Sequence, residues 1–293
     1  MEKIIYKIII NSLKLLSYLP FSILYVKAKF LFFIAFYVIR YRRKVVFENL
    51  RNSFPDKTDK EILLIAKKFY QNLADLIIEF LKIYSITKSD LEKRVHIKNI
   101  ELLDELYAKD KNIMGIIGHC GNWEWGMIYL NMISKYKVLG AVKPLSNKYF
   151  EEYFHSLRTK FSPPDAIIHF KYMLRNLVKL KGTKTMCILA GDQTPTKNEI
   201  NYWTTFLNQD TPVFLGTEKM SQALDYAVIF VDIQRIKRGY YEIEFHLIAE
   251  NPKETKEFEI TEQHVRFLEK LIKQHPDNWL WSHRRWKHKR ESN

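Results

Sequence analysis

The chain has 293 residues, 47% of them hydrophobic, which is enough to build one large domain with a sizeable core. Nine glycines and nine prolines exclude a collagen-like or broadly disordered chain, and the two cysteines exclude a disulfide framework. The net charge of +14 predicts an anionic partner (a membrane surface, a nucleic acid or a phosphate-rich substrate), unless it marks only a solvated basic surface. Most of the excess lies at the ends, because residues 1–60 hold twelve Lys/Arg against four Asp/Glu and residues 284–293 hold five against one.

The first 40 residues are apolar but interrupted. Lysines break the segment Ile4–Ile39, Pro20 lies near its centre, and its longest clean run is Phe30–Ile39. A membrane-spanning helix needs roughly 20 apolar residues. Three interpretations stay open: a helix lying in or shallowly under the membrane surface with snorkelling lysines, which we favour, a poor spanning segment, or a pair of buried core helices. The basic cluster at residues 40–44 agrees with a cytoplasmic flank in all three cases.

A long helix is predicted after Pro55. Thr58 followed by Glu61 has the pattern of a capping box at a helix start. Apolar residues then recur at helical spacing. They are Ile62, Ala66, Phe69, Leu73, Ile77, Phe80 and Tyr84. We therefore expect an amphipathic helix packed on the core.

From about residue 95, short apolar runs alternate with helical stretches, which is typical of an α/β fold with a mixed, largely parallel sheet flanked by helices. The expected strands are Asn112–Gly118, Val138–Val142, Ala166–His169, Thr185–Ala190, Ala227–Ile233 and Tyr241–Ile248. The expected helices lie near 122–134, 147–160, 171–181 and 217–225. The last two strands, joined through Gly239, are predicted to form an antiparallel hairpin. A final helix should open near Thr261, between Ile260 and Val265, and end at about Gln274.

The segment Ile113–Trp125 carries the strongest chemical signal. It reads I-M-G-I-I-G-H-C-G-N-W-E-W, a buried strand, a small-residue turn and a helix, and it places His119 just beyond the strand. Sites in open α/β sheets form beyond the carboxyl ends of strands. Glu124 follows His119 by five positions, so on one helix the two would face different ways. They can meet only if His119 lies in the turn before the helix, which Gly118 and Gly121 permit.

A histidine oriented by a carboxylate can accept a proton from a hydroxyl, which is the general-base half of acyl transfer. His119 and Glu124 are therefore the candidate catalytic pair. The spacing alone favours a structural histidine at a strand end. Cys120 is a weaker candidate nucleophile, because it directly follows His119 and a pair of neighbouring residues is sterically awkward.

The segment G-H-C-G-N-W-E-W resembles the signature of the late lipid A biosynthesis acyltransferases, bacterial relatives of the lysophospholipid acyltransferase superfamily. Further matching blocks occur in the same order over residues 40–286. They are Arg42-Arg43 through Glu48-Asn49-Leu50 to Phe54-Pro55; Lys143-Pro144-Leu145, Asn147, Tyr149-Phe150 and Arg158; Gly191-Asp192-Gln193; and Pro276, Trp279, Leu280, Trp281 and His283-Arg284-Arg285-Trp286. Together these blocks are specific, although most are not specific singly.

The resemblance implies a mixed sheet between helices, a membrane anchor at residues 1–44 and an acyltransferase domain at residues 45–293. It implies a location on the cytoplasmic face of the inner membrane. It also implies an acyl thioester donor (acyl carrier protein, or alternatively coenzyme A) and a hydroxyl of a lipid A precursor as acceptor. A lysophospholipid, an aminolipid or a glycolipid is the alternative acceptor. A non-enzymatic basic protein that binds membrane or nucleic acid is the remaining alternative.

The same resemblance assigns His119 and Glu124 as the catalytic pair. It places Arg158 toward the anionic substrate or the developing oxyanion, with Asp192 and Gln193 lining the same site. Lys143 and Arg158, near a predicted helix, are both suited to binding a phosphate. The stretch Thr205–Gly216 departs from the family pattern, which often has Phe-Phe-Gly near the acyl chain. This departure, like the lysines in the anchor, concerns the acceptor and the acyl length more than the chemistry.

The tail from Trp279 to Arg290 interleaves aromatic and basic residues, a pattern that suits a membrane interface, a surface that stacks nucleic-acid bases or a structural cluster. The membrane is favoured because no nucleic-acid-binding module is recognisable, so we expect an anionic membrane surface and no nucleic acid as partner. The chain has no P-loop or dinucleotide motif, and its nine histidines are scattered. We therefore expect no cofactor and no metal.

Overall fold

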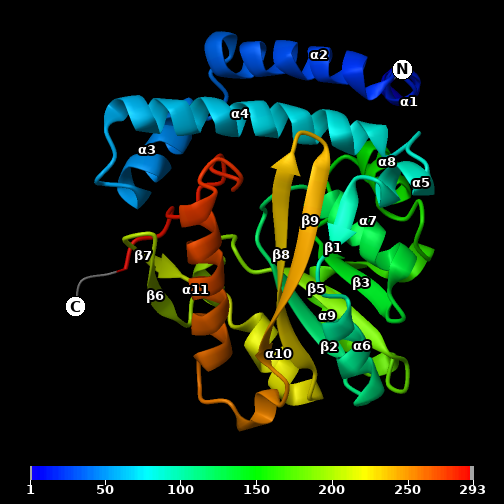
Figure 1. Ribbon diagram of the computed structural model, residues 1–293, viewed down its shortest axis with the longest axis vertical. Coiled ribbons are helices and arrows are strands. Elements are labelled where there is room, and N and C mark those ends of the chain that lie inside the picture. Colours follow the sequence, from blue (N-terminus) through cyan, green and yellow to red (C-terminus); the bar gives the residue numbers. More distant parts are fainter. Residues whose placement is uncertain (1, 291–293) are drawn as a thin grey trace.

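The structure is a computed structural model that describes residues 2–290, and its elements are shown in Figure 1. The helices are α1 (Glu2–Ser17), α2 (Phe21–Phe33), α3 (Arg43–Ser53), α4 (Asp59–Lys82), α5 (Lys88–Glu92), α6 (Glu101–Ala108), α7 (Trp123–Ile133), α8 (Lys148–Arg158), α9 (Met173–Lys179), α10 (Gly216–Leu224) and α11 (Glu259–Gln274). The strands are β1 (Val95–Ile97), β2 (Ile113–Ile117), β3 (Lys137–Val142), β4 (Ile167–His169), β5 (Thr185–Ala190), β6 (Trp203–Phe206), β7 (Gln209–Pro212), β8 (Ala227–Lys237) and β9 (Tyr240–Ala249). Short turns of helix are η1 (Ile34–Val38, a π-helical turn), η2 (Pro164–Ala166), η3 (Phe170–Tyr172), η4 (Lys197–Glu199) and η5 (Pro252–Glu254).

Seven strands form one sheet in the order β1-β9-β8-β2-β5-β3-β4. Every pairing is parallel except the β8–β9 hairpin, which is antiparallel as expected and turns at Gly239. The sequence-based prediction of a mixed, largely parallel α/β sheet is therefore confirmed. The six predicted strands are β2, β3, β4, β5, β8 and β9, each within a few residues of the expected bounds.

Helices cover both faces of this sheet because its central strands are apolar on both sides. Along β2, Ile113 and Ile117 join the cluster that contains residues of α6, α7 and α8. The alternate residues Met114 and Ile116 join the opposite cluster, which contains residues of α9 and α11. The period of two along one strand thus separates the two hydrophobic layers of the domain.

Three strands, three helices (α3, α5 and α6) and one helix boundary differ from the expectation. The strands β1, β6 and β7 were not predicted, and they have only three or four residues each. The last helix, α11, begins at Glu259, two residues before Thr261. Thr261 does not cap it. Its backbone N–H and hydroxyl both donate to the carboxylate of Glu218 on α10, at 2.8 and 2.7 Å, so this threonine joins two helices.

The long helix α4 runs across the end of the sheet above β8 and β9 (Figure 1). It starts with the predicted capping box, in which the Thr58 side chain and Glu61 satisfy each other's backbone N–H groups. The predicted apolar stripe is only partly right, because Ile77 is 44% exposed while the neighbouring Ile78 is buried. The buried face of α4 also includes the carboxylates Asp75 and Glu79.

Those two acids fix α4 over the sheet. Asp75 accepts from Arg235 (Nη2–Oδ2 2.7 Å) and from Arg238 (Nε–Oδ2 2.9 Å), both at the end of the β8–β9 hairpin. Glu79 accepts from the Tyr241 hydroxyl at 2.7 Å. Because each acid keeps its hydrogen-bonding partners in the interior, the cost of burying them is offset. The position of α4 relative to the carboxyl ends of the strands is therefore set by specific contacts.

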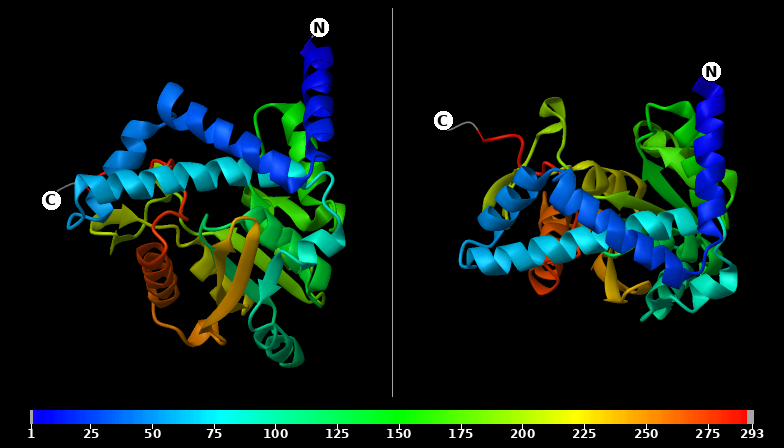
Figure 2. Two further views of the ribbon diagram at one scale, coloured as in Figure 1. Left: turned by 45° about the horizontal axis from the view of Figure 1, so that its top comes forward. Right: turned by 90° about the horizontal axis from the view of Figure 1, so that it is seen from above.

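The N-terminal helices pack on the outside of this body (Figure 2). Helix α2 contacts α4 through Leu24 and Ala28 and exposes its other side. The helical segment Phe21–Val38 is long and apolar enough to cross a membrane by length and composition alone, and 17% of it is buried. The interpretation of this segment as a buried core helix is therefore wrong. Helix α1 packs against α8, where the ring of Tyr6 stacks on that of Tyr149 with 5.2 Å between the ring centroids.

Candidate active site

His119 lies in the turn between β2 and α7, at the carboxyl edge of the central strand. The turn is possible because Gly121 has a left-handed conformation, with φ of +58°. Asn122 then caps α7, since its side-chain oxygen accepts from the backbone N–H of Trp125 at 2.9 Å. The amide group of Asn122 donates to Glu79 at 2.8 Å, which ties this turn to α4. His119 is thus where the sequence predicted it, before the helix and beyond the strand.

Replacing Gly121 with alanine should strongly destabilise the protein. A Cβ at this position would lie 2.5 Å from the backbone oxygen of Ile233, and the left-handed backbone adds about 1–2 kcal/mol. We expect Gly121→Ala to lower the free energy of unfolding by more than about 2 kcal/mol in urea titrations of the detergent-solubilised protein. Gly182→Ala is the matched control, because Gly182 also has positive φ but a Cβ added there would have nothing within 4 Å. Equal losses in both variants would show that the turn tolerates the extra atom.

The structure joins His119 to Asp192. The ring Nδ1 of His119 lies 2.7 Å from Oδ1 of Asp192, and the backbone N–H of His119 donates to Oδ2 at 2.8 Å. The indole N–H of Trp279 donates to the same Oδ2 at 2.8 Å. Asp192 follows β5, the parallel neighbour of β2, so the two residues meet because their strands end side by side. Three donors hold this buried carboxylate in one orientation.

Electrostatics favour a charged Asp192 and a basic His119. Burial would raise the pKa of Asp192, but the charge of His119 and the hydrogen bonds from His119 and Trp279 hold it well below its usual range. Burial would lower the pKa of His119, but the charge and hydrogen bond of Asp192 outweigh burial, and Glu124 adds to them, so the pKa of His119 is raised. An ionised Asp192 accepts the Nδ1 proton, which leaves the lone pair of neutral His119 on Nε2.

The free nitrogen of His119 faces Gln193. Its Nε2 lies 3.3 Å from the side-chain nitrogen of Gln193, which is placed to donate to the lone pair. The side chain of His119 is 16% exposed to solvent, whereas that of Asp192 is 3% exposed. Of the two, only His119 is therefore open to another molecule, and a hydroxyl that displaced Gln193 would meet the basic nitrogen.

Glu124 contacts Arg158, and in the part of the chain that the structure describes it makes no hydrogen bond to His119. Arg158 donates to Glu124 through Nε at 2.9 Å and Nη2 at 2.6 Å, a two-point ion pair between α7 and the last residue of α8. The side chain of Glu124 is 16% exposed, and that of Arg158 is 21% exposed. The expectation that Glu124 orients the ring is therefore corrected, because Asp192 makes that contact.

Lys143 and Cys120 stand apart from this group. Lys143 is exposed in the loop after β3, and its side chain makes no hydrogen bond or ion pair with the residues described. Cys120 is 3% exposed, and burial together with the charges of Asp192 and Asp232 raises the pKa of its thiol well above the ordinary value. A buried, protonated thiol is a poor nucleophile, so the structure agrees with leaving Cys120 out of the chemistry.

A narrow opening leads to His119 from below α4. Its lining includes Phe69, Asn72, Leu73, Leu76, His119, Trp123, Asp277, Asn278, Trp279 and Leu280. Its volume is about 10 Å³, which holds at most one water molecule. The α4 side of the opening is mostly apolar. A longer ligand can enter only if side chains on α4 or in the segment 277–280 move.

The aromatic tail is mostly internal. Trp279 and Trp281 are 2% and 0% exposed, so their interpretation as membrane-interface residues is wrong. Trp279 instead supports Asp192, a role that no local pattern indicated beyond its place in a matching block. Asn122 and Glu79 were likewise missed as supports of the His119 turn, although Asn122 has the residue type of a helix cap.

The fold and the site define an α/β protein with a largely parallel sheet. Its candidate site is a carboxylate–histidine pair beyond the carboxyl ends of two central strands, where sites in such sheets form. The chain belongs to the bacterial lipid A biosynthesis acyltransferase family, whose model matches residues 2–288. It is accordingly an acyltransferase of lipid A biosynthesis. A search of the curated proteins gave no match.

Proposed function

We propose that the protein transfers a fatty acyl chain from an acyl thioester to a hydroxyl of a lipid A precursor, with His119 as the general base. The observation that carries this proposal is the hydrogen bond from His119 to the buried Asp192, which leaves the lone pair on Nε2 of a side chain that is partly exposed. Family membership supplies the reaction class. Acyl carrier protein is the expected donor and coenzyme A the alternative.

In the proposed reaction, Nε2 of His119 removes the proton of the acceptor hydroxyl as its oxygen attacks the thioester carbonyl carbon. The new carbon–oxygen bond forms and a tetrahedral oxyanion results. Its collapse breaks the carbon–sulfur bond, and the imidazolium returns the proton to the leaving sulfur, which departs as a thiol. Asp192 holds the ring and stabilises the imidazolium without taking the proton itself.

Glu124 and Arg158 act beside the histidine in this proposal. The charge of Glu124 stabilises the imidazolium, as the raised pKa of His119 indicates. Arg158 uses Nε and Nη2 on Glu124, so Nη1 is left for the oxyanion or an anionic group of a substrate. Gln193 lines the acceptor side, and the exposed Lys143 is placed to bind a phosphate of either substrate.

The apolar wall of the narrow opening suits the fatty chain of the donor or acceptor, with Leu73 and Leu76 moving to admit it. We also propose that residues 1–44 anchor the protein on the cytoplasmic face of the inner membrane and that residues 45–293 form the acyltransferase domain. The exposed apolar side chains of α1 and α2 and the basic residues at 40–44 support this assignment. An in-plane anchor would keep the His119 opening close to lipid acceptors.

The proposal is tested by incubating purified protein with acyl carrier protein carrying a labelled acyl chain and a total lipid extract. We expect one new labelled lipid in the mass spectrum, heavier than its precursor by one acyl group. A product mass that matches an acylated lipid A precursor identifies the acceptor. If the labelled product derives from a lysophospholipid, an aminolipid or a glycolipid, the acceptor is that lipid and the proposed reaction type still holds. If neither acyl carrier protein nor coenzyme A donors label any lipid, the proposed reaction is wrong.

A further inference from the structure

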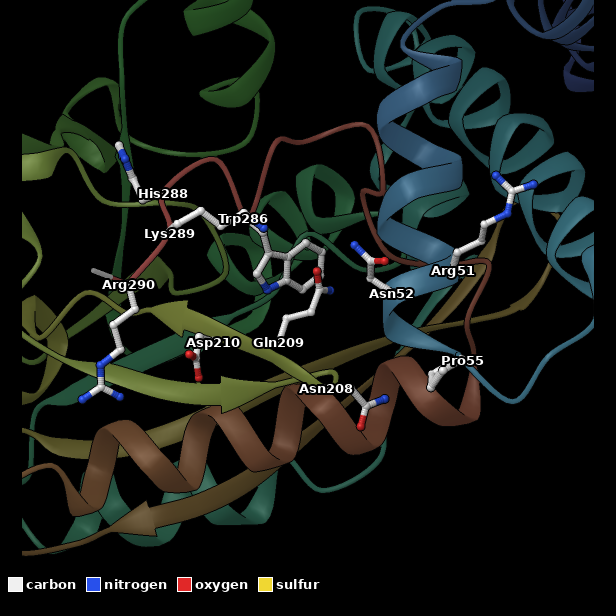
Figure 3. Close-up of a pocket in the computed structure, with 10 residues that line it drawn as sticks. All are labelled: Arg51, Asn52, Pro55, Asn208, Gln209, Asp210, Trp286, His288, Lys289 and Arg290. Atoms are coloured by element: carbon white, nitrogen blue, oxygen red, sulfur yellow. The ribbon is translucent and has the colours of Figure 1, made fainter. Parts of the chain in front are cut away.

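A second cavity lies between α3, the β6–β7 hairpin and the C-terminal tail (Figure 3). We call it the tail groove. Its lining consists of Arg51, Asn52, Pro55, Asn208, Gln209, Asp210, Trp286, His288, Lys289 and Arg290. Its volume of about 550 Å³ is in the range of small-molecule sites. The indole rings of Trp286 and Trp279, 5.9 Å apart, lie between the groove and Asp192, so the groove is separate from the His119 opening.

One wall of the tail groove is held rigidly. At the turn of the β6–β7 hairpin, Leu207 and Asn208 both have positive φ, 49° and 63°. Leucine rarely adopts this conformation, and here it persists because its side chain is fully buried and its N–H donates to Glu269 at 3.1 Å. Asn208 donates to the backbone oxygen of Ser53 at 3.1 Å, which ties the hairpin to α3. This wall is therefore formed before any ligand arrives.

Trp286 gives the groove a fixed aromatic surface. Its indole N–H donates to the hydroxyl of Thr211 at 2.7 Å, and its ring stacks with Phe206 at a centroid distance of 6.2 Å. An indole held in this way loses little freedom when a ligand binds. It provides a flat, partly apolar face, which suits the apolar face of a sugar ring.

Charge in the groove favours an anion. Lys289 and Arg290 are exposed and lie on one side of Trp286, and Arg51 lies on the other (Figure 3). Arg51 is already paired with Asp59 at 3.0 Å, so the two tail residues supply most of the free positive charge. Among the described residues that line the groove, Asp210 is the only one with a carboxylate.

The groove also offers amides that are free to bind. The side chain of Asn52, at the end of α3, makes no hydrogen bond within the described residues, and Figure 3 shows it between Arg51 and Trp286. The side chain of Gln209 uses only its nitrogen, in a long 3.4 Å contact with Ser53. Free amides beside an aromatic ring can bind sugar hydroxyls, while the neighbouring cations bind a phosphate.

We propose that the tail groove binds a phosphate-bearing sugar. Two sources share this chemistry: the headgroup of an anionic glycolipid and a soluble sugar phosphate. If the source is the glycolipid, the groove binds the acceptor of the proposed reaction at a distance from His119, and in that case alone the inference rests on the proposed function. The salt dependence of binding should reflect contact of the phosphate with the two tail cations.

The test is calorimetry on the full-length protein with glucosamine 1-phosphate as probe. We expect Lys289→Gln combined with Arg290→Gln to weaken binding at least 10-fold, because both phosphate-binding cations are lost. The matched control is Lys179→Gln combined with Lys181→Gln, the same charge change at exposed positions outside the groove, which should alter binding less than 2-fold. No binding to the wild type, or equal loss in both double variants, overturns the proposal.

Asn52→Ala tests whether the groove recognises the sugar. It should weaken binding of glucosamine 1-phosphate about 5-fold, the effect of one hydrogen bond, and leave binding of inorganic phosphate unchanged. If both probes respond alike to Asn52→Ala, the sugar part of the proposal is wrong.

A kinetic measurement separates the two sources. If the tail double variant (Lys289→Gln with Arg290→Gln) raises KM for the lipid acceptor at constant kcat, the ligand is the glycolipid headgroup. An unchanged KM together with weakened probe binding identifies a soluble sugar phosphate. His119→Ala should bind the probe like the wild type, so failure of the groove and failure of the proposed reaction give different results.

Discussion

His119→Ala should lower kcat/KM for acyl transfer by a factor of about 10²–10⁴, the usual contribution of a general base. The reason is geometric: His119 is hydrogen-bonded to a buried carboxylate through one nitrogen, and its other nitrogen faces only the side chain of Gln193, on a ring that is partly exposed. Removing the ring takes away the proton acceptor and leaves Asp192 with the indole N–H of Trp279 as its remaining side-chain donor. The measurement is initial rate against acceptor concentration with labelled acyl donor.

Two controls keep this result interpretable. His96→Ala removes an exposed histidine of β1, away from the site, and should change kcat/KM less than 2-fold. The melting temperature of His119→Ala shows whether the loss of activity reflects unfolding, because Asp192 is then buried with one partner fewer. A folded His119→Ala enzyme that keeps more than about a tenth of wild-type activity would mean that another group is the base.

The general architecture was readable because the central strands are apolar runs flanked by helical stretches. The short β6–β7 hairpin was not, since its strands read W-T-T-F and Q-D-T-P and carry no alternating apolar pattern. Its turn places Leu207 in a left-handed conformation, where glycine or asparagine is the usual signal. Helix α4 was predicted, but only part of its buried face was. It packs against α2 as well as against the sheet, so it buries a wider arc than the single stripe with Ile77 suggested.

In the candidate site, too, the sequence indicated the residues but not which of them meet in space. His119 was expected beyond a strand end and Asp192 in the lining of the same site, and the structure brings them together. Which carboxylate meets the ring depends on β2 and β5 being neighbours, and strand order is not readable from local periodicity. Glu124 is close to His119 in sequence, but at the start of α7 it meets Arg158, which arrives from the far end of α8. Sequence proximity therefore favoured the wrong orienting partner.

Asp192→Asn should lower kcat/KM by about 10²–10⁴ and move the acidic limb of its pH profile to lower pH. Asparagine removes the negative charge that raises the pKa of His119, and its amide can turn to favour the tautomer with the proton on Nε2. The sign follows from the role of a base. Activity requires unprotonated His119, so log kcat/KM rises with pH until the pKa of His119 is passed. A lower pKa therefore shifts this rise to lower pH, while the misplaced proton reduces the plateau.

Glu124→Gln is the matched comparison, because it also replaces a carboxylate near His119 by an amide of the same shape. It keeps the bond between His119 and Asp192 and weakens the ion pair with Arg158. Since Glu124 raises the pKa of His119 less than Asp192 does, Glu124→Gln should shift the acidic limb less, whatever its effect on the plateau. If Glu124→Gln shifts the limb further than Asp192→Asn, then Glu124 is the partner of His119 during turnover, and the ion pair with Arg158 must open before the reaction.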